Sequence, residues 1–316
     1  MRKQVVNLTA ALFCISLMWA SAPAHAALNI QAEYLYDLQG PTKDSHLQSQ
    51  NGIVCDFQRN EIYVVDTGNR CIRIFGKEGV QIFEFGSNGE LTTPLEVAIN
   101  SLGDMYVLQS DFGGAQIDIF DFRGKHLSKL ELAGLPENET CEPNDIAIDS
   151  RDNIYISDRK HACIFAFDRD GQFRFKILPD MSEGDREEVI FGNLRIDKDD
   201  NLYLPVSTLG TVYVFDSQGQ HVRNFGIRGG SSGKLAFPVD VAIDKSGRFL
   251  VLDKMRHCIS VYDSEGRYLT EFGGLGRGPG WFYFPSALEI DRYGRIYVSQ
   301  RFGDKVQVLK LKEESK

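Results

Sequence analysis

Apolar and polar residues alternate along this chain in a pattern that recurs. An apolar run ending in Asp or Asn is followed by a turn and then by a β-branched and aromatic run, as in "DIAIDSRDNIYISD" at 145–158 and "DVAIDKSGRFLVLD" at 240–253. Runs of this composition predict β-strands, and the polar turn predicts that each pair forms a hairpin. The aligned positions from Tyr63 to Tyr297 recur at steps of 43, 49, 48, 47 and 47 residues. This spacing indicates stacked supersecondary units.

Each unit continues with two further strand-like runs. The third run ends in an aromatic residue in five copies, and a glycine follows four positions later, as at Phe167 and Gly171. Glycine supplies the positive φ of a tight turn, so this spacing predicts a second hairpin. A helical stripe at i, i+3 and i+4 is not sustained anywhere. The sequence therefore predicts an all-β fold, a six-bladed β-propeller of four-stranded antiparallel blades.

The sixth unit has three strand-like runs, the last in "KVQVLKLKEESK". Near the other end of the chain, "YLYDLQG" at 34–40 aligns with "YLTEFGG" at 268–274, the fourth run of the fifth unit. We expect this N-terminal strand to complete the last blade, because an unclosed ring would expose two sheet edges. The expected single domain spans 27–316, with blades at about 51–87, 92–134, 142–180, 190–226, 236–274, and 284–310 plus 28–40.

The first 26 residues have the features of a secretory signal peptide. Arg2 and Lys3 precede the apolar run "LTAALFCISLMWA", and residues 24–26 form a small-x-small cleavage site. We expect an exported protein, periplasmic or extracellular, with no stable membrane span after cleavage.

Charge argues against one class of partner. The 316-residue chain has a formal net charge of −9, and removal of the signal changes it to −11, with 33 Lys and Arg against 44 Asp and Glu. Phosphate backbones are bound by clustered Lys and Arg, so we expect no nucleic-acid partner. The sequence does not indicate an oligomeric state.

Three cysteines, Cys71, Cys163 and Cys258, occupy one repeat position in alternate units. Side chains placed around a ring in this way lie too far apart for a disulfide, so we expect small buried thiols. A disulfide that involves Cys55 or Cys141 remains open.

The units resemble the NHL repeat family. The resemblance rests on a proline shortly before the "VAID"-like strand, on "YVVDTGNRCIRIF" at 63–75 and on "EFGGLGRGPGWFYFP" at 271–285. It covers essentially the whole chain after the signal, and it implies a six-bladed ring. The top face of that ring would carry the loops before each inner strand and after each second strand. The family includes binding modules, RNA readers and lyases, so the resemblance does not by itself imply one activity.

The first position of the recurring passage is expected at the channel mouth of the ring. Four blades place an oxygen-bearing side chain there, at Glu96, Asp145, Asn193 and Asp240. Carboxylate and amide oxygens suit a hard cation, so a calcium site is one interpretation, and the arrangement is similar to the central metal site of gluconolactonase and paraoxonase propellers. A structural role for a residue that recurs in every repeat is the other interpretation. No metal ligand or catalytic residue is assigned from the sequence.

Top-face loops supply a second set of candidates, because loops on a rigid scaffold often carry recognition. They are Arg70, Lys160, His161, Arg256 and His257. A solvated surface is the alternative interpretation. The favoured function is a non-enzymatic module or scaffold that binds a protein or peptide through its top face and needs no cofactor. The alternative is a calcium-dependent hydrolase or lyase with its site at the channel mouth.

Overall fold

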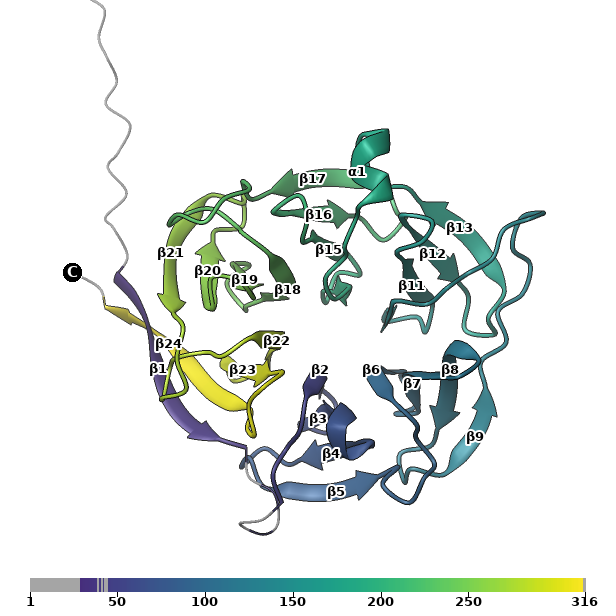
Figure 1. Ribbon diagram of the computed structural model, residues 1–316, viewed down its shortest axis with the longest axis horizontal. Helices are drawn as coiled ribbons and strands as arrows, with labels where there is room; N and C mark the ends of the chain where they lie inside the picture. Colours follow the sequence, from purple (N-terminus) through teal and green to yellow (C-terminus); the bar gives the residue numbers. More distant parts are fainter. Residues whose placement is uncertain (1–28, 39, 41, 43–44, 315–316) are drawn as a thin grey trace, which may run out of the picture.

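The computed structural model describes residues 29–314 except 39, 41, 43 and 44. Within this part the chain forms six four-stranded antiparallel sheets arranged as a ring (Figure 1). This confirms the predicted fold class. Each blade runs from an inner strand at the channel to an outer strand at the rim, in chain order for blades one to five.

The strand bounds follow the repeat. Blades one to three contain β2 (Gln50–Asp56), β3 (Glu61–Asp66), β4 (Cys71–Phe75) and β5 (Gln81–Phe85); β6 (Pro94–Ile99), β7 (Met105–Asp111), β8 (Gly114–Phe120) and β9 (His126–Lys129); and β10 (Asp145–Ile148), β11 (Ile154–Asp158), β12 (Cys163–Phe167) and β13 (Phe173–Ile177). Blades four to six contain β14 (Arg195–Ile196), β15 (Leu202–Val206), β16 (Thr211–Phe215) and β17 (His221–Phe225); β18 (Pro238–Ile243), β19 (Phe249–Asp253), β20 (Cys258–Tyr262) and β21 (Tyr268–Gly273); and β22 (Pro285–Ile290), β23 (Arg295–Gln300), β24 (Gln307–Glu314) and β1 (Asn29–Asp37).

The N-terminal strand β1 closes the ring, as the sequence predicts. It pairs antiparallel with β24, from Asn29 opposite Glu314 to Asp37 opposite Gln307, and so becomes the outer strand of blade six. The observed strand is shorter than the expected segment 28–40. The predicted signal peptide lies outside the described residues.

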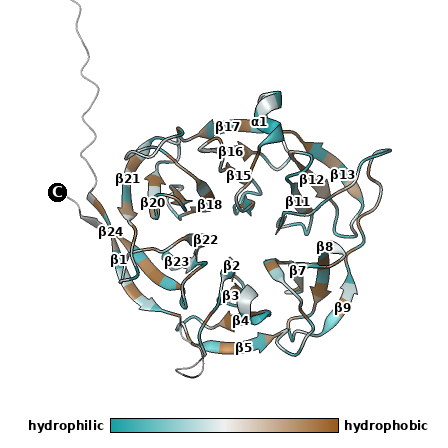
Figure 2. Ribbon diagram, in the orientation of Figure 1, coloured by the Kyte–Doolittle hydropathy of each residue, from teal (hydrophilic) through white to brown (hydrophobic). Residues whose placement is uncertain are grey.

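The core consists of apolar layers between adjacent blades, which appear as brown stretches on the strands in Figure 2. The layer between blades six and one contains Leu38, Ile53, Tyr297 and Val308, all nearly inaccessible to solvent. This layer unites the two ends of the chain, so hydrophobic burial and strand pairing both hold the ring closed.

The predicted second hairpin is present in each of the first five blades. In blade two, Asp121 Oδ1 accepts hydrogen bonds from the N–H groups of Arg123 and Lys125, both at 2.9 Å, and Gly124 adopts φ 75°. The Asp therefore satisfies the turn backbone while glycine provides the left-handed conformation.

Two local features depart from the repeat. The inner strand β14 has only two residues, and a short helix, α1 (Glu183–Glu187), interrupts the loop between blades three and four. Ser182 caps that helix by accepting a hydrogen bond from Asp185 N–H at 3.2 Å. Across the part of the chain that the structure describes, the five cysteines are free thiols, and no helix is long and apolar enough to cross a membrane.

Candidate functional site

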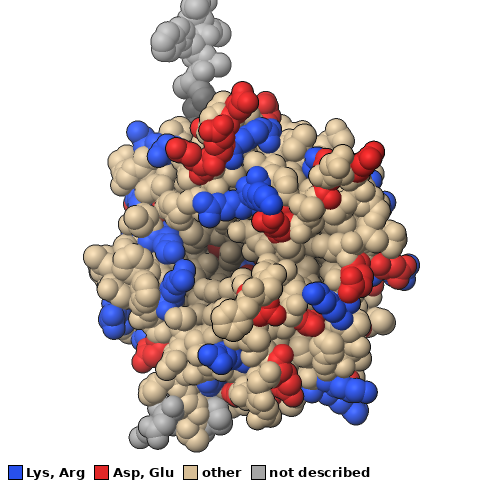
Figure 3. All heavy atoms as spheres, turned by 45° about the vertical axis from the view of Figure 1, so that its right-hand side comes forward, with Lys and Arg blue, Asp and Glu red and all other residues tan. Residues whose placement is uncertain are grey.

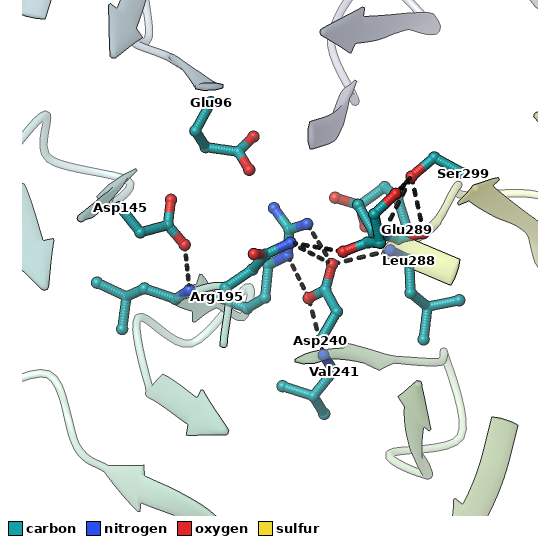
Figure 4. Close-up of polar contacts among 12 residues, drawn as sticks. Glu96, Asp145, Arg195, Asp240, Val241, Leu288, Glu289 and Ser299 are labelled. Atoms are coloured by element: carbon teal, nitrogen blue, oxygen red, sulfur yellow. Dashed lines mark hydrogen bonds and ion pairs between the residues drawn. The ribbon is translucent and has the colours of Figure 1, made fainter. Parts of the chain in front are cut away.

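The predicted channel-mouth residues do converge on the ring axis, at slightly different strand positions than expected. Asp145 begins β10, whereas Glu96 and Asp240 are the third residues of β6 and β18, and Asn193 precedes β14 by two residues. Figure 4 shows Glu96, Asp145 and Asp240 around one central space. Glu96 and Asp145 are 4% exposed and Asp240 is fully buried.

Asp145 and Asp240 link neighbouring blades. Asp145 Oδ2 accepts a hydrogen bond from Leu194 N–H of blade four at 2.6 Å, and Asp240 Oδ2 accepts one from Leu288 N–H of blade six at 2.8 Å. The other carboxylate oxygen of each Asp accepts from the N–H of the residue that follows it. These two side chains satisfy backbone donors at the starts of inner strands, which is the structural role that the sequence left open.

Arg195 lies in the middle of the channel and pairs with Asp240 in a bidentate geometry. Its Nε is 2.8 Å from Asp240 Oδ1, and its Nη2 is 2.6 Å from Asp240 Oδ2 (Figure 4). Asn193 Nδ2 donates to the same Oδ2 at 2.9 Å. The Asp240 carboxylate is thus saturated with hydrogen-bond donors, and Arg195 supplies its countercharge.

The sequence interpretation missed Arg195 and Glu289, which both stand two positions beyond the mouth residue of their strands. A signal was present in the sequence, because these two residues are charged at a repeat position that is otherwise occupied by small apolar residues. The other four copies have Val54, Ala98, Ala147 and Ala242 there. A charged residue at a position that the repeat keeps small and apolar marks a side chain that enters the channel.

Glu96 reaches across the mouth toward blade one. A Cβ on Gly52 would lie only 2.2 Å from Glu96 Oε1, so glycine at that repeat position makes room for the carboxylate. Oε1 also accepts a hydrogen bond from Val97 N–H at 3.1 Å, and no hydrogen bond from another described side chain reaches this group.

Burial dominates the electrostatics of the channel, where four carboxylates share one guanidinium. Burial raises the pKa of Asp145 to about 7 and that of Glu289 to about 7, although the Arg195 charge acts in the opposite direction. Burial, with the nearby negative charge of Asp145, raises the pKa of Glu96 well above its usual range. Near neutral pH Asp145 and Glu289 are therefore partly protonated.

The donor set of the mouth fits a resident cation poorly. Both oxygens of Asp145 and of Asp240 already accept backbone N–H groups, and a fixed guanidinium supplies positive charge beside Asp240. Among the described residues, no group of three or more His, Cys, Asp or Glu side chains has the arrangement of a metal site.

The five predicted top-loop residues do not form one site, since they lie in blades one, three and five. Arg70 ends the short turn η1 (Thr67–Asn69) in a left-handed conformation. Lys160 pairs with Glu142, His161 Nδ1 lies 2.8 Å from Asp158 Oδ2, and Arg256 Nη2 lies 2.7 Å from Glu271 Oε1. Each of these three contacts joins two residues of the same blade.

His257 leads to a feature that the sequence interpretation did not identify. Its Nδ1 accepts a hydrogen bond from Phe284 N–H at 3.1 Å, and its ring meets the Phe284 ring edge-on at 4.9 Å. Tyr283 and Phe302 pack on the same ring, with centroids 5.1 and 5.4 Å away. Loops 254–257, 274–284 and 301–303 thus build an aromatic cluster on the top face of blades five and six, which we call the platform.

The platform contains a strained residue and exposed apolar surface. Phe284 has φ 51° although it is bulky and precedes Pro285, a combination of two unfavourable conditions that costs about 1–3 kcal/mol. Phe302 is 56% exposed and Trp281 is 52% exposed. Trp281 rests on Gly274, where a Cβ would come within 2.6 Å of its ring, so the glycine-rich loop is needed to seat the indole.

Known proteins agree with this architecture. A sequence profile described as a 6-bladed beta-propeller matches residues 245–314, and the NHL repeat profile matches residues 140–167. With the six blades in Figure 1, these matches define the class: the chain is a six-bladed β-propeller. The NHL repeat match lies in blade three, and the six blades confirm the fold that the resemblance to this repeat family implies.

Individual relatives are distant or partial. "Protein brain tumor" of Drosophila melanogaster is 30% identical over 131 residues, which cover 40% of this chain and 12% of that protein, so the chain spans a small part of that relative. An auxiliary nutrient binding protein from Bacteroides thetaiotaomicron has a TM-score of 0.65 at 12% identity, over 90% of this chain and 77% of that chain. A gluconolactonase from Xanthomonas campestris has a TM-score of 0.61 at 15% identity, over 91% of each chain. Identities this low show the fold alone.

Proposed function

We propose that this propeller is a non-enzymatic binding module that recognises a protein or peptide partner through the platform. One observation carries the proposal: large apolar side chains stay exposed there on a rigid base. Aromatic anchors that lose little conformational entropy on binding are the residues that dominate protein interfaces. The strained backbone at Phe284 supports the same conclusion, because such strain clusters at functional sites.

A calcium-dependent hydrolase or lyase at the channel mouth has less support. Such an enzyme needs carboxylate oxygens that are free to bind a metal or a substrate. Asp145 and Asp240 use both oxygens on backbone donors, and Asp240 also pairs with Arg195. The hydrogen bonds of these mouth residues therefore connect neighbouring blades and leave few free oxygens for a ligand.

Similar proteins include both kinds of activity. A nutrient binding protein and a gluconolactonase share the fold at comparable TM-scores. The fold similarity thus leaves the choice to the site, and the platform favours binding. Export to the periplasm or the cell exterior belongs to the same proposal and rests on the N-terminal sequence.

The test is a pull-down with residues 27–316 as bait, from envelope and extracellular extracts of the source cells. Phe302→Ser removes an anchor from the platform. Phe57→Ser is the matched control, since Phe57 is 51% exposed in an inner-hairpin turn on the opposite face. A partner retained by the parent and by the control, but not by Phe302→Ser, supports the proposal. No specific partner, or equal retention by both variants, contradicts it.

A further inference from the structure

The platform carries positive charges that lack acidic partners. Lys254 and Arg301 come from the loops after β19 and β23, the second strands of the adjacent blades five and six, and neither forms an ion pair with a described carboxylate. Burial lowers the pKa of Lys254, and the neighbouring charge of Arg301 lowers it further. Two cations held close together without an acid are unfavourable in the isolated protein.

Three other cations on the same face are neutralised. Lys160 pairs with Glu142, Lys176 pairs with Glu139, and Arg256 pairs with Glu271. Arg277 of the platform instead lies over the Tyr283 ring, with its guanidinium carbon 4.3 Å from the ring centroid. Lys254, Arg277 and Arg301 have no acidic partner among the described residues, and all three lie in the loops that form the aromatic cluster.

The rest of the top face has the opposite charge. The loops 130–144 and 178–194, which we call the acidic sector, contain nine Asp and Glu residues and one Arg, whereas the loops 226–237 and 274–284 contain three Lys and Arg and no acid. Figure 3 shows basic side chains to the left of the central hollow and more numerous acidic ones above it and to its right, with some basic ones among them. A long polyanion laid across this face would meet the acidic sector and be repelled.

We propose that the platform docks a short acidic segment of a protein partner, with an aromatic or aliphatic side chain against Phe302 and Phe284 and carboxylates facing Lys254 and Arg301. This inference rests on the proposed function and names the chemistry of the partner. The aromatic cluster provides the anchor, and the cations provide orientation and a preference for acids. The acidic sector restricts the length and direction of the segment.

The probe is a displayed library of random short peptides, selected on the parent propeller at low salt. We expect the selected peptides to combine Asp or Glu with at least one large apolar residue. Binding of a selected peptide should weaken steeply as ionic strength rises, because exposed charge contacts are screened. Neutral or basic selected peptides would overturn the proposal, as would a failure to select any.

A matched pair of double variants locates the interaction. Lys254→Gln with Arg301→Gln should weaken the selected peptide by about tenfold, the expected size for the loss of two charge contacts. Lys77→Gln with Arg123→Gln removes two cations from outer-hairpin turns on the opposite face, including one that lies over the Phe122 ring, and should leave affinity unchanged. Thermal melts confirm that all variants are folded. Equal affinity of the two double variants would overturn the proposal.

A pool of random single-stranded RNA provides the competing outcome, because cations beside aromatic rings also bind bases and phosphates. RNA that binds more tightly than the selected peptides, and that Lys254→Gln with Arg301→Gln releases, would reassign the platform to nucleic acid. The results also distinguish this inference from the proposed function. If Phe302→Ser abolishes partner retention while acidic peptides are not preferred, the binding module stands and only the acidic segment is rejected.

Discussion

The channel mouth and the platform differ in which side chains are buried and which have polar partners. At the mouth, Asp145 and Asp240 are buried and saturated with backbone donors, and Arg195 is paired. On the platform, Phe302 is more than half exposed, and Lys254 has no acidic partner among the described residues. Convergence of polar groups on an axis therefore does not by itself mark a binding site, since a ring of repeats needs polar links between its blades.

The difference predicts that changes in the two regions separate stability from binding. Channel substitutions should change the free energy of unfolding and leave partner affinity intact in the folded fraction. Platform substitutions should do the reverse, because exposed side chains contribute little to folding. Three further changes test this separation, in order of decreasing expected effect.

Deletion of residues 29–38 should damage both regions at once. It removes β1 from blade six, which also carries platform residues, and exposes the edge of β24. The buried side chains of Ile30 and Leu38 contribute about 1.5–3 kcal/mol each. The β1–β24 ladder is lost as well, so the free energy of unfolding should fall by more than about 5 kcal/mol in a urea titration.

Rescue in trans provides the control for this deletion. A synthetic peptide of residues 29–38 should restore both the unfolding transition and peptide binding. The same peptide with Ala32→Pro and Tyr34→Pro should not, because proline lacks the N–H that the ladder needs. A deletion variant that unfolds like the parent would place the closing strand elsewhere.

Sequence alone predicts the closing strand and the blades because they depend on period-two patterns and turn residues that recur six times. Arg195 and Glu289 were missed because they occupy a position that the other four repeats keep small and apolar, so the recurring pattern predicts no polar side chain there. The platform was missed for another reason. Its parts, Tyr283, Phe302 and His257, lie in three loops of irregular sequence, and only the radial arrangement brings them together.

Substitution of Arg195 should have the next largest effect. Arg195→Met leaves Asp240 buried without its countercharge, which costs about 3–5 kcal/mol of unfolding free energy at pH 7. Arg151→Met is the matched control, because Arg151 is 53% exposed and meets Asp149 and Asp200 only at 3.6 Å, so its loss should cost less than about 1 kcal/mol.

The affinity of Arg195→Met for the selected peptide, measured at low temperature, tests whether the channel and the platform are separate sites. If the channel is structural, the folded fraction of Arg195→Met should bind the selected peptide within about twofold of the parent. A large loss of affinity without loss of stability would show that the channel and the platform form one site.

The smallest effect concerns the titration of Glu289. Its pKa is raised by burial from an ordinary value of about 4 to about 7, so between these values the folded protein keeps a proton that the unfolded chain has lost. The stability from this group is therefore complete below pH about 4 and is lost as pH rises through about 7. Glu289→Gln cannot ionise and keeps an acceptor oxygen for Ile290 N–H, which the Glu289 carboxylate binds at 2.9 Å.

Urea titrations of Glu289→Gln and the parent at pH 5 and pH 8 measure this effect. After allowance for solvent screening, the variant should gain about 1–2 kcal/mol over the parent at pH 8 and little at pH 5. Glu78→Gln, at a carboxylate that is 79% exposed, should follow the parent at both values. Peptide affinity should be the same for Glu289→Gln and the parent at each pH, because Glu289 titrates inside the channel and the platform cations do not depend on it. Parallel stability curves for the variant and the parent would mean that this carboxyl is hydrated in solution, and the mouth would then be open enough to admit a ligand.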